Sequence, residues 1–301
     1  ICATGREYFD EPAVAAMVGC FPEDSFSVFN GYDGHRKSLL AGLDPWAARG
    51  GGHFAVVHAD PRDPDMMRRV PELAEASGCF LVGGLASSRG TYAHVAGSLT
   101  ESALSGVMFS AEAPVATALT QGCSPIGPIH EVTQCQANIA VEIDGRAALD
   151  VLKDDIGEVL AQDLNRIGGY IFAAFPVTGS DRADYVVRNL VGLDEERGLV
   201  AIGAPLEDGQ RVIFCRRDGK TARDDLARML GDLKRRATTP AKGAVYFTCL
   251  GRGPNMFGTQ SAELAAIQDE LGDVPLVGFF CNGEISHNRV YGYTGVLSLF
   301  L

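Results

Sequence analysis

The chain has 301 residues and a formal net charge of −12. This acidity argues against nucleic acids and anionic membrane surfaces as partners, because both are bound through clustered Lys and Arg side chains. Hydrophobic residues make up 46% of the chain and charged residues 21%, a composition typical of a globular protein. The length predicts one to three domains.

Targeting and metal signals are absent from the sequence. No apolar run approaches the roughly 20 residues that a membrane-spanning helix needs, and no signal peptide is visible. The eight cysteines form no CxxC pair and have no zinc-type spacing. These features predict reduced thiols, a cytoplasmic location and no metal site. Because Ile1 lies in an apparent turn between two strands, we expect at least one further strand ahead of it.

The first part of the chain is typical of strands joined by one helix and Gly-rich turns. Asp63, Pro64 and Asp65 begin the helix. Gly83 and Gly84 directly follow an apolar strand and indicate close backbone packing. We predict strands over 13–18, 25–29, 54–58, 80–82 and 104–109, a helix that ends near residue 76, and a strand over 115–119 that continues the same sheet.

The middle of the chain begins with a linker, QGCSPIGP (121–128), whose two prolines and two glycines exclude a regular strand. A helix with apolar residues at helical spacing opens at residue 147, and a second amphipathic helix over 221–236 has Thr221 as its N-cap. We predict strands over 131–141, 170–175, 185–194, 198–202 and 209–215, the last three as an antiparallel meander.

The C-terminal stretch alternates apolar strands with polar turns. A strand over 244–247 leads into the turn 249–255, and a short helix follows. A strand over 276–280 then leads into the turn 281–284, before a last β-rich run. Polar turns at strand ends place Arg, Asn, Cys and Glu at one rim of a sheet, where ligand sites are common.

This stretch has an earlier counterpart. When residues 54–67 are set without gaps against 244–257, Arg62 falls on Arg252, and two further residues also match. Later apolar strands match in the same order. The matches predict that one unit, strand–turn–helix–strand–turn–strand, occurs twice, and residues 1–20 are typical of the tail of a third copy.

Three motifs carry a family resemblance. They are LGRGPNMFG (250–258) with LVGFFCNGEISHN (276–288), the linker 121–128 followed by IDGRAA (143–148), and ICATGREYFDEPAVAAMV (1–18). Together they resemble the N-terminal and C-terminal halves of the FIST domain. The resemblance implies a sensory module for small ligands, with haem as the ligand in one branch, and it implies no settled reaction.

We therefore expect an α+β fold with two related domains. Residues 1–140 form the FIST N-terminal-like domain, with its N-terminal portion missing, and residues 141–301 form the FIST C-terminal-like domain. Each domain has a mostly antiparallel or mixed sheet flanked by helices. The two sheets are expected to pack against each other with the helices outside.

The predicted ligand site lies near the junction of the halves, in the turns described above. Its residues are Gln121, Gly122, Cys123, Cys249, Arg252, Asn255, Cys281, Asn282 and Glu284. Arg252 is suited to a ligand carboxylate, because guanidinium groups bind carboxylates with two hydrogen bonds. Glu284 is suited to an amine, and the two together to an amino-acid-like ligand.

Each of these residues also has a structural alternative. Cys123 either touches the ligand, holds a constrained turn or acts as a nucleophile, and a nucleophilic thiol needs a basic neighbour that the sequence does not identify. Arg252 either binds the ligand, caps a helix or pairs with Glu284. Glu284 either binds the ligand or forms a buried pair that fixes the two turns.

The histidines have no HExxH spacing. Haem needs only one axial side chain, and His94 and His287, in apparent turns at corresponding places of the two units, are its candidates. His58 lies on an apolar strand, which is typical of a buried core residue. No GxSxG motif, phosphate loop or dinucleotide fingerprint is present.

The main functional prediction is a non-enzymatic cytoplasmic module in signal transduction, with no cofactor, that binds a small ligand. The more specific prediction is that this small ligand is amino-acid-like. The chain has no kinase, cyclase or methyl-acceptor segment, so a signalling partner protein is expected. The alternatives are a haem-based nitric oxide sensor and an enzyme with Cys123 or Cys281 as its nucleophile.

Overall fold

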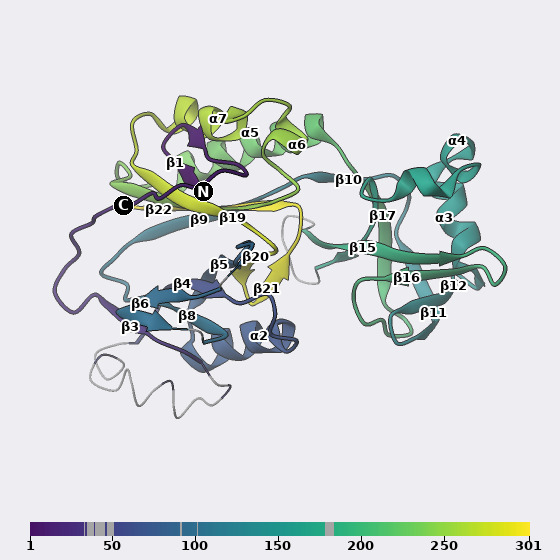
Figure 1. Ribbon diagram of the computed structural model, residues 1–301, viewed down its shortest axis with the longest axis horizontal. Coiled ribbons are helices and arrows are strands. Elements are labelled where there is room, and N and C mark those ends of the chain that lie inside the picture. Colours follow the sequence, from purple (N-terminus) through teal and green to yellow (C-terminus); the bar gives the residue numbers. More distant parts are fainter. Residues whose placement is uncertain are drawn as a thin grey trace. The chain divides into compact units, whose positions relative to one another are not determined.

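The structure is a computed structural model that describes residues 1–32, 34, 39, 46, 51–90, 92–100, 102–177 and 184–301 (Figure 1). Helices and several sheets occur together in these ranges, which confirms the predicted α+β class. Within the same ranges, no helix combines the length and the apolar character needed to span a membrane.

The chain divides into two compact units. The larger one contains residues 1–121 and 222–301, and the smaller one contains residues 122–221. This division differs from the expected boundary near residue 140. The cause is the pairing of β9 (Val115–Gln121) with β22 (Thr294–Phe300) along its whole length, which joins an early strand to the end of the chain in one sheet.

The larger unit contains two six-stranded sheets. Sheet A has the order β2 (Arg6–Glu7), β1 (Cys2–Ala3), β19 (Leu276–Cys281), β18 (Gly243–Cys249), β22 and β9. Sheet B has the order β21 (Arg289–Tyr291), β20 (Glu284–His287), β5 (Phe80–Leu85), β4 (Phe54–Ala59), β8 (Leu104–Phe109) and β3 (Phe26–Phe29). A separate hairpin consists of β6 (His94–Ala96) and β7 (Ser98–Thr100).

Helices cover the outer face of each sheet (Figure 1). Helix α2 (Met66–Ser77) packs on sheet B, while α5 (Gly219–Arg236), α6 (Pro254–Phe257) and α7 (Ala262–Leu271) pack on sheet A. The inner faces meet in an aromatic core that includes Phe54 of sheet B and Phe300 of sheet A, with ring centroids 6.2 Å apart. The predicted face-to-face packing of two sheets with helices outside is therefore confirmed in this unit.

The two sheets have matching strand orders, as the predicted duplication requires. In each, a parallel pair joined by a helix is flanked by an antiparallel strand, and a β-hairpin extends the other edge. The two parallel strands of sheet B lie close together at Gly83, where an added Cβ would be 1.8 Å from the Val57 carbonyl oxygen. In sheet A, a Cβ added to Gly278 would lie 1.7 Å from the Tyr246 carbonyl oxygen.

The hairpins on the sheet edges are exchanged between the sheets. Strand β20 follows β19 of sheet A along the chain, but it pairs with β5 of sheet B. The short hairpin of β1 and β2 takes the matching place beside β19. The turn 281–284 is therefore the point where the chain passes from one sheet to the other.

The smaller unit is a ring of antiparallel strands. Its strands are β10 (Cys123–Pro125), β11 (His130–Gln136), β12 (Ile139–Ile143), β13 (Arg146–Ala147), β14 (Ile171–Pro176), β15 (Tyr185–Asp194), β16 (Leu199–Ile202) and β17 (Arg211–Arg217). The ring closes because β17 pairs with both β11 and β14. Its helices are α3 (Ala148–Ile156), α4 (Glu158–Ala161) and the 3-10 turn η1 (Leu164–Ile167), and α3 covers the core.

Several predictions of strands were wrong. Residues 131–141 form a hairpin, not one strand, because Ala137 adopts φ +55° in a two-residue turn with Asn138. Residues 13–18 form no strand, and the Val14 and Val18 side chains are 95% and 94% exposed. No described strand pairs with this segment, so its apolar residues do not belong to a sheet.

Sheet membership also differs from the prediction. Strand β9 belongs to sheet A and does not continue the sheet of β8. The linker contains the short strand β10, which pairs with β17. Strands β15 and β16 pair as predicted, but β17 lies on the other side of β14, so the three form no meander. The first turn of α5 is capped by Asp218, which accepts hydrogen bonds from two backbone amides, and not by Thr221.

Candidate functional site

Arg252 lies in a closed network inside the larger unit. Its Nη2 and Nε donate to Glu263 Oε1 at 2.6 and 2.8 Å, and neither residue has exposed surface. The hydroxyl of Tyr246 donates to the same oxygen at 2.6 Å. The structural alternative of an ion pair is thus correct for Arg252, but the partner is Glu263 of α7 and not Glu284. The matched Arg62 pairs instead with Asp60 at the surface.

Glu284 is also completely buried. Its Oε2 accepts hydrogen bonds from the Thr294 hydroxyl at 2.8 Å and the Thr294 amide at 3.2 Å. Its Oε1 has no hydrogen-bond partner among the described residues. Burial raises the pKa of Glu284 to about 8, so its carboxyl is mostly protonated at neutral pH.

The cysteines of the predicted site are buried or partly buried thiols. Cys249 and Cys281 sit side by side on β18 and β19, and burial followed by the charge of Glu284 raises the pKa of both. A thiol with a raised pKa is a weak nucleophile at neutral pH. Cys123 lies in β10 of the smaller unit, where it is fully buried, and its carbonyl accepts a hydrogen bond from the Tyr185 hydroxyl.

The remaining predicted residues have mainly backbone contacts. The backbone amide of Gln121, the last residue of β9, donates to Asp225 Oδ2 at 2.7 Å. The Gly122 carbonyl accepts from the Asp218 amide in the smaller unit. Asn255 Nδ2 donates to the Leu250 carbonyl at 3.2 Å. Asn282 Nδ2 donates to the Ala86 carbonyl at 3.0 Å, which connects the two sheets.

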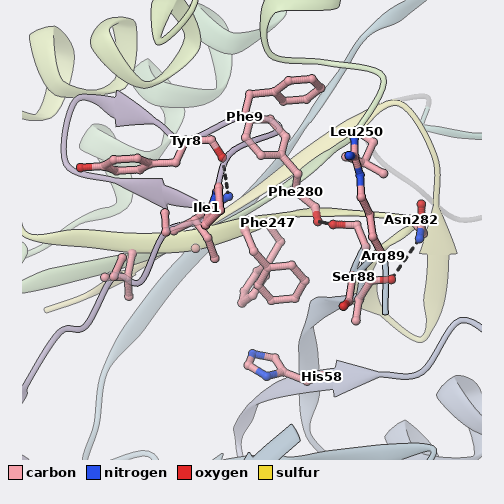
Figure 2. A pocket seen from close by; sticks show the side chains of 18 of the residues that line it. Ile1, Tyr8, Phe9, His58, Ser88, Arg89, Phe247, Leu250, Phe280 and Asn282 are labelled. Atoms are coloured by element: carbon pink, nitrogen blue, oxygen red, sulfur yellow. Dashed lines mark hydrogen bonds between the residues drawn. The ribbon is translucent and has the colours of Figure 1, made fainter. Parts of the chain in front are cut away.

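A cavity of about 1100 Å³ lies between sheets A and B. Its walls are Val56 and His58 of β4, Val245 and Phe247 of β18, and Val277 to Phe280 of β19. Loop residues 8–13 and 86–89, and residues 93–95 where β6 begins, lie around them (Figure 2). Of the nine predicted site residues, all in described ranges, only Asn282 lines it. The turns 249–255 and 281–284 lie at the ends of β18 and β19, as predicted, but the cavity was not predicted.

Two histidines that line this cavity lie close together. The rings of His58 and His94 have centroids 6.1 Å apart, and His58 also contacts the rings of Phe247 and Phe279 at 6.3 and 5.1 Å. Burial, followed by the neighbouring His94, lowers the pKa of His58 to about 4. Burial also lowers the pKa of His94. Both imidazoles are therefore neutral at physiological pH.

The two haem candidates have different surroundings. His94 is 6% exposed, lies at the start of β6, and has its Nδ1 3.2 Å from the Ser105 hydroxyl oxygen. His287 ends β20, is exposed and stacks on Phe80 with centroids 5.2 Å apart. Neither histidine lies in a turn as predicted, and only His94 lines the cavity. His58, expected to be an ordinary core residue, also lines it.

The charged residues of the cavity lie at its exposed rim. Arg89 forms an ion pair with Asp10, and their side chains are 83% and 56% exposed. Ser87 in the same loop donates to the Phe280 carbonyl. Figure 2 shows Ser88, Arg89 and Asn282 on one side of the cavity, and His58 apart from them near Phe247. The cavity thus has an apolar, aromatic interior and a polar rim.

Comparisons with known proteins identify the family. The FIST N domain matches residues 1–146, and the FIST C domain matches residues 148–287. An uncharacterized protein of Mycobacterium tuberculosis is 34% identical over 194 residues, and one of Mycobacterium bovis is 32% identical over 192 residues. Each alignment covers 61% of this chain, and the matched region is half of each relative. The chain belongs to the FIST family, whose domains are sensory domains for small ligands in signal transduction.

Proposed function

We propose that this chain is a sensory module that binds a small, amino-acid-like ligand in the cavity between sheets A and B. The single observation that carries the proposal is this cavity of about 1100 Å³, which lies where the two related sheets face each other. Small-ligand sites are mostly apolar hollows with a few convergent polar groups, and this cavity has that composition.

The rim offers partners for both charges of an amino acid. The Arg89 guanidinium suits the carboxylate, because it can donate two parallel hydrogen bonds. Asp10 and Glu11 suit the ammonium group. These exposed residues replace Arg252 and Glu284, which have no exposed surface. An apolar ligand side chain would then extend toward Phe247 and Phe279.

The proposal includes a cytoplasmic, non-enzymatic role with a separate signalling partner. All eight cysteines, each in a described range, are free thiols, as a reducing compartment would keep them. The raised pKa of Cys281 disfavours a thiolate nucleophile. Replacing Cys123 or Cys281 by Ser should therefore leave ligand binding nearly unchanged, whereas an enzyme that used either thiol would lose its activity.

Haem is the second candidate ligand. It is favoured by one observation: His94 lines the cavity and its Nε2 is a buried imidazole nitrogen with no partner among the described residues. An axial imidazole would supply the one protein bond that haem iron needs. A visible absorbance band on adding haem, absent in His94→Phe, would support this candidate.

The main proposal is tested by thermal unfolding against a panel of amino acids and their analogues. A ligand at 100 times its Kd stabilises the folded state by about 2.7 kcal/mol. For a unit of this size we expect the Tm to rise by about 5 °C or more. No shift with any amino-acid-like compound would contradict the proposal.

A matched pair of variants locates the binding. Val277→Phe adds a ring inside the cavity, and Val191→Phe makes the same change at a strand position of the smaller unit where Val191 is 59% exposed. We expect Val277→Phe to abolish the ligand-induced shift and Val191→Phe to retain it. An equal shift in both variants would place the ligand elsewhere.

A further inference from the structure

Neither the His58 ring nor Nε2 of His94 makes a hydrogen bond within the described structure. The ring contacts of His58 in the described structure are aromatic only, with His94, Phe247 and Phe279. Only 6% of the surface of His94 is exposed, and its Nε2 has no hydrogen-bond partner among the described residues. Buried polar atoms in folded proteins are nearly always hydrogen-bonded, so His94 Nε2 calls for a polar group from outside the chain, and that group would lie beside the His58 ring.

The charge state of the pair limits what that group can be. Burial lowers the pKa of His58 to about 4, so its charged form is disfavoured by about a thousandfold at pH 7. Burial lowers the pKa of His94 too, although Asp60 acts in the opposite direction. The Asp60 carboxylate is itself held by Arg62, with 2.6 Å between Oδ2 and Nη2. Two neutral imidazoles suit an uncharged hydrogen-bonding group better than a carboxylate.

A metal ion fits this pair poorly. In the described ranges, no three His, Cys, Asp or Glu side chains are grouped so that they could hold a metal. The nearest polar neighbour of His94 is the Ser105 hydroxyl, 3.2 Å from Nδ1, which is a weak metal ligand. The rings in contact with His58 are those of His94, Phe247 and Phe279.

We propose that the buried end of the ligand is a phenol whose hydroxyl hydrogen-bonds His58 and His94 and whose ring packs against the cavity aromatics. This inference rests on the proposed function and names the chemical class of the same ligand. A hydroxyl donates and accepts at one atom, so it satisfies both imidazoles when one directs a bare ring nitrogen and the other an N–H toward it. The flat ring suits edge-to-face contacts with Phe247 and Phe279.

The test compares p-cresol with toluene, which differ only in the hydroxyl. Binding of each to the whole chain is measured by isothermal titration calorimetry. Sites built around a ligand hydroxyl reject the analogue that lacks it, so we expect p-cresol to bind at least about tenfold more tightly than toluene. Equal affinities would overturn the inference, because they would mean apolar recognition only.

Variants connect this preference to the histidines. We expect His94→Phe to bring the p-cresol affinity down to that of toluene while toluene binding is retained. His287→Phe is the matched control, since His287 is exposed and outside the cavity, and it should keep the preference. If His94→Phe does not fold, His58→Phe and the imidazole ¹⁵N shifts of the wild type answer the same question. Those shifts should move with p-cresol and not with toluene.

The outcomes separate this inference from the proposed function. If amino acids raise the Tm but p-cresol does not bind, or binds equally to both histidine variants, the phenol is wrong and the sensory proposal stands. If neither the amino-acid panel nor p-cresol binds, both fail. Selective p-cresol binding that is lost in His94→Phe supports the phenol, and the amino-acid panel decides the sensory proposal separately.

Discussion

The guanidinium of Arg252 and the carboxylate of Glu263 form an ion pair with no exposed surface on either partner, and their closest nitrogen and oxygen atoms are 2.6 Å apart. Tyr246 and Thr248 donate further hydrogen bonds to the same carboxylate. The pair fixes the turn after β18 against the first turn of α7. It therefore uses, for structure, the arginine that the sequence suggested for ligand binding.

Arg252→Met is predicted to destabilise the protein without a specific loss of ligand binding. Removing one partner leaves a buried, uncompensated Glu263, which costs about 3–5 kcal/mol. The double variant Arg252→Met with Glu263→Gln should recover much of that loss. Urea unfolding measures the stabilities, and calorimetry on the folded fraction measures binding. A ligand role for Arg252 would instead show normal stability and weakened binding.

Glu284→Gln is predicted to make the protein more stable, increasingly so as pH rises. The folded pKa is about 8 and the ordinary value is 4.5, so between these values the unfolded state releases a proton that the folded state keeps. Wild-type stability should thus fall from pH 5 to pH 8, by at most on the order of 3 kcal/mol, while the variant lacks this contribution. Urea unfolding at both pH values provides the comparison. Parallel pH profiles for the two proteins would refute the buried, protonated carboxyl.

His58 should weaken the larger unit at acid pH. Its folded pKa is about 4 against an ordinary 6.5, so the unfolded state takes up a proton first as pH falls below 6.5. The expected loss between pH 6.5 and 4 is at most about 3 kcal/mol. His58→Leu removes this contribution. In unfolding experiments, the free energy of unfolding of the variant should therefore rise relative to that of the wild type as pH falls. A constant difference would mean that the imidazole titrates normally.

His130 in the smaller unit should stabilise the fold at low pH, the opposite of the pH effect expected for His58. Its Nδ1 and Nε2 lie 2.6 Å from Asp144 and 3.0 Å from Asp155, so the imidazolium bridges two carboxylates. Burial alone would lower the pKa of His130, but these two hydrogen bonds raise it above 6.5.

The stabilisation from this bridge is complete below pH 6.5 and disappears as pH rises through the folded pKa. The stability gap between wild type and His130→Gln should therefore shrink from pH 6 to pH 9. A gap for His130→Gln that widens with pH would show that the imidazole is neutral in the folded state.

Elements with a strong local pattern were predicted well. The amphipathic helix near 221–236 and the apolar strand at 54–58 are in place, because helical and strand periodicity are properties of the residues themselves. The repeat also predicted two similar sheets. The pairing of β9 with β22 was missed because it joins residues about 180 positions apart, and no local signal sets such a partner.

The site could be predicted only in part. Asn282 was identified from its turn, and it does line the cavity. Arg252 and Glu284 resembled ligand residues, but Arg252 is paired with Glu263 and one oxygen of Glu284 is bonded to Thr294. His58 was missed because an apolar strand does not reveal which of its faces meets a second sheet. That face became visible only when β4 was placed opposite β18.

The most direct test of an amino-acid-like ligand between the two sheets is native mass spectrometry of the protein as purified from cells. We predict a co-purifying mass of amino-acid size on the wild type and on Val191→Phe, and none on Val277→Phe, whose added ring fills the cavity. The same adduct on all three proteins, or a haem mass with a visible absorbance band, would contradict an amino-acid-like ligand between the two sheets.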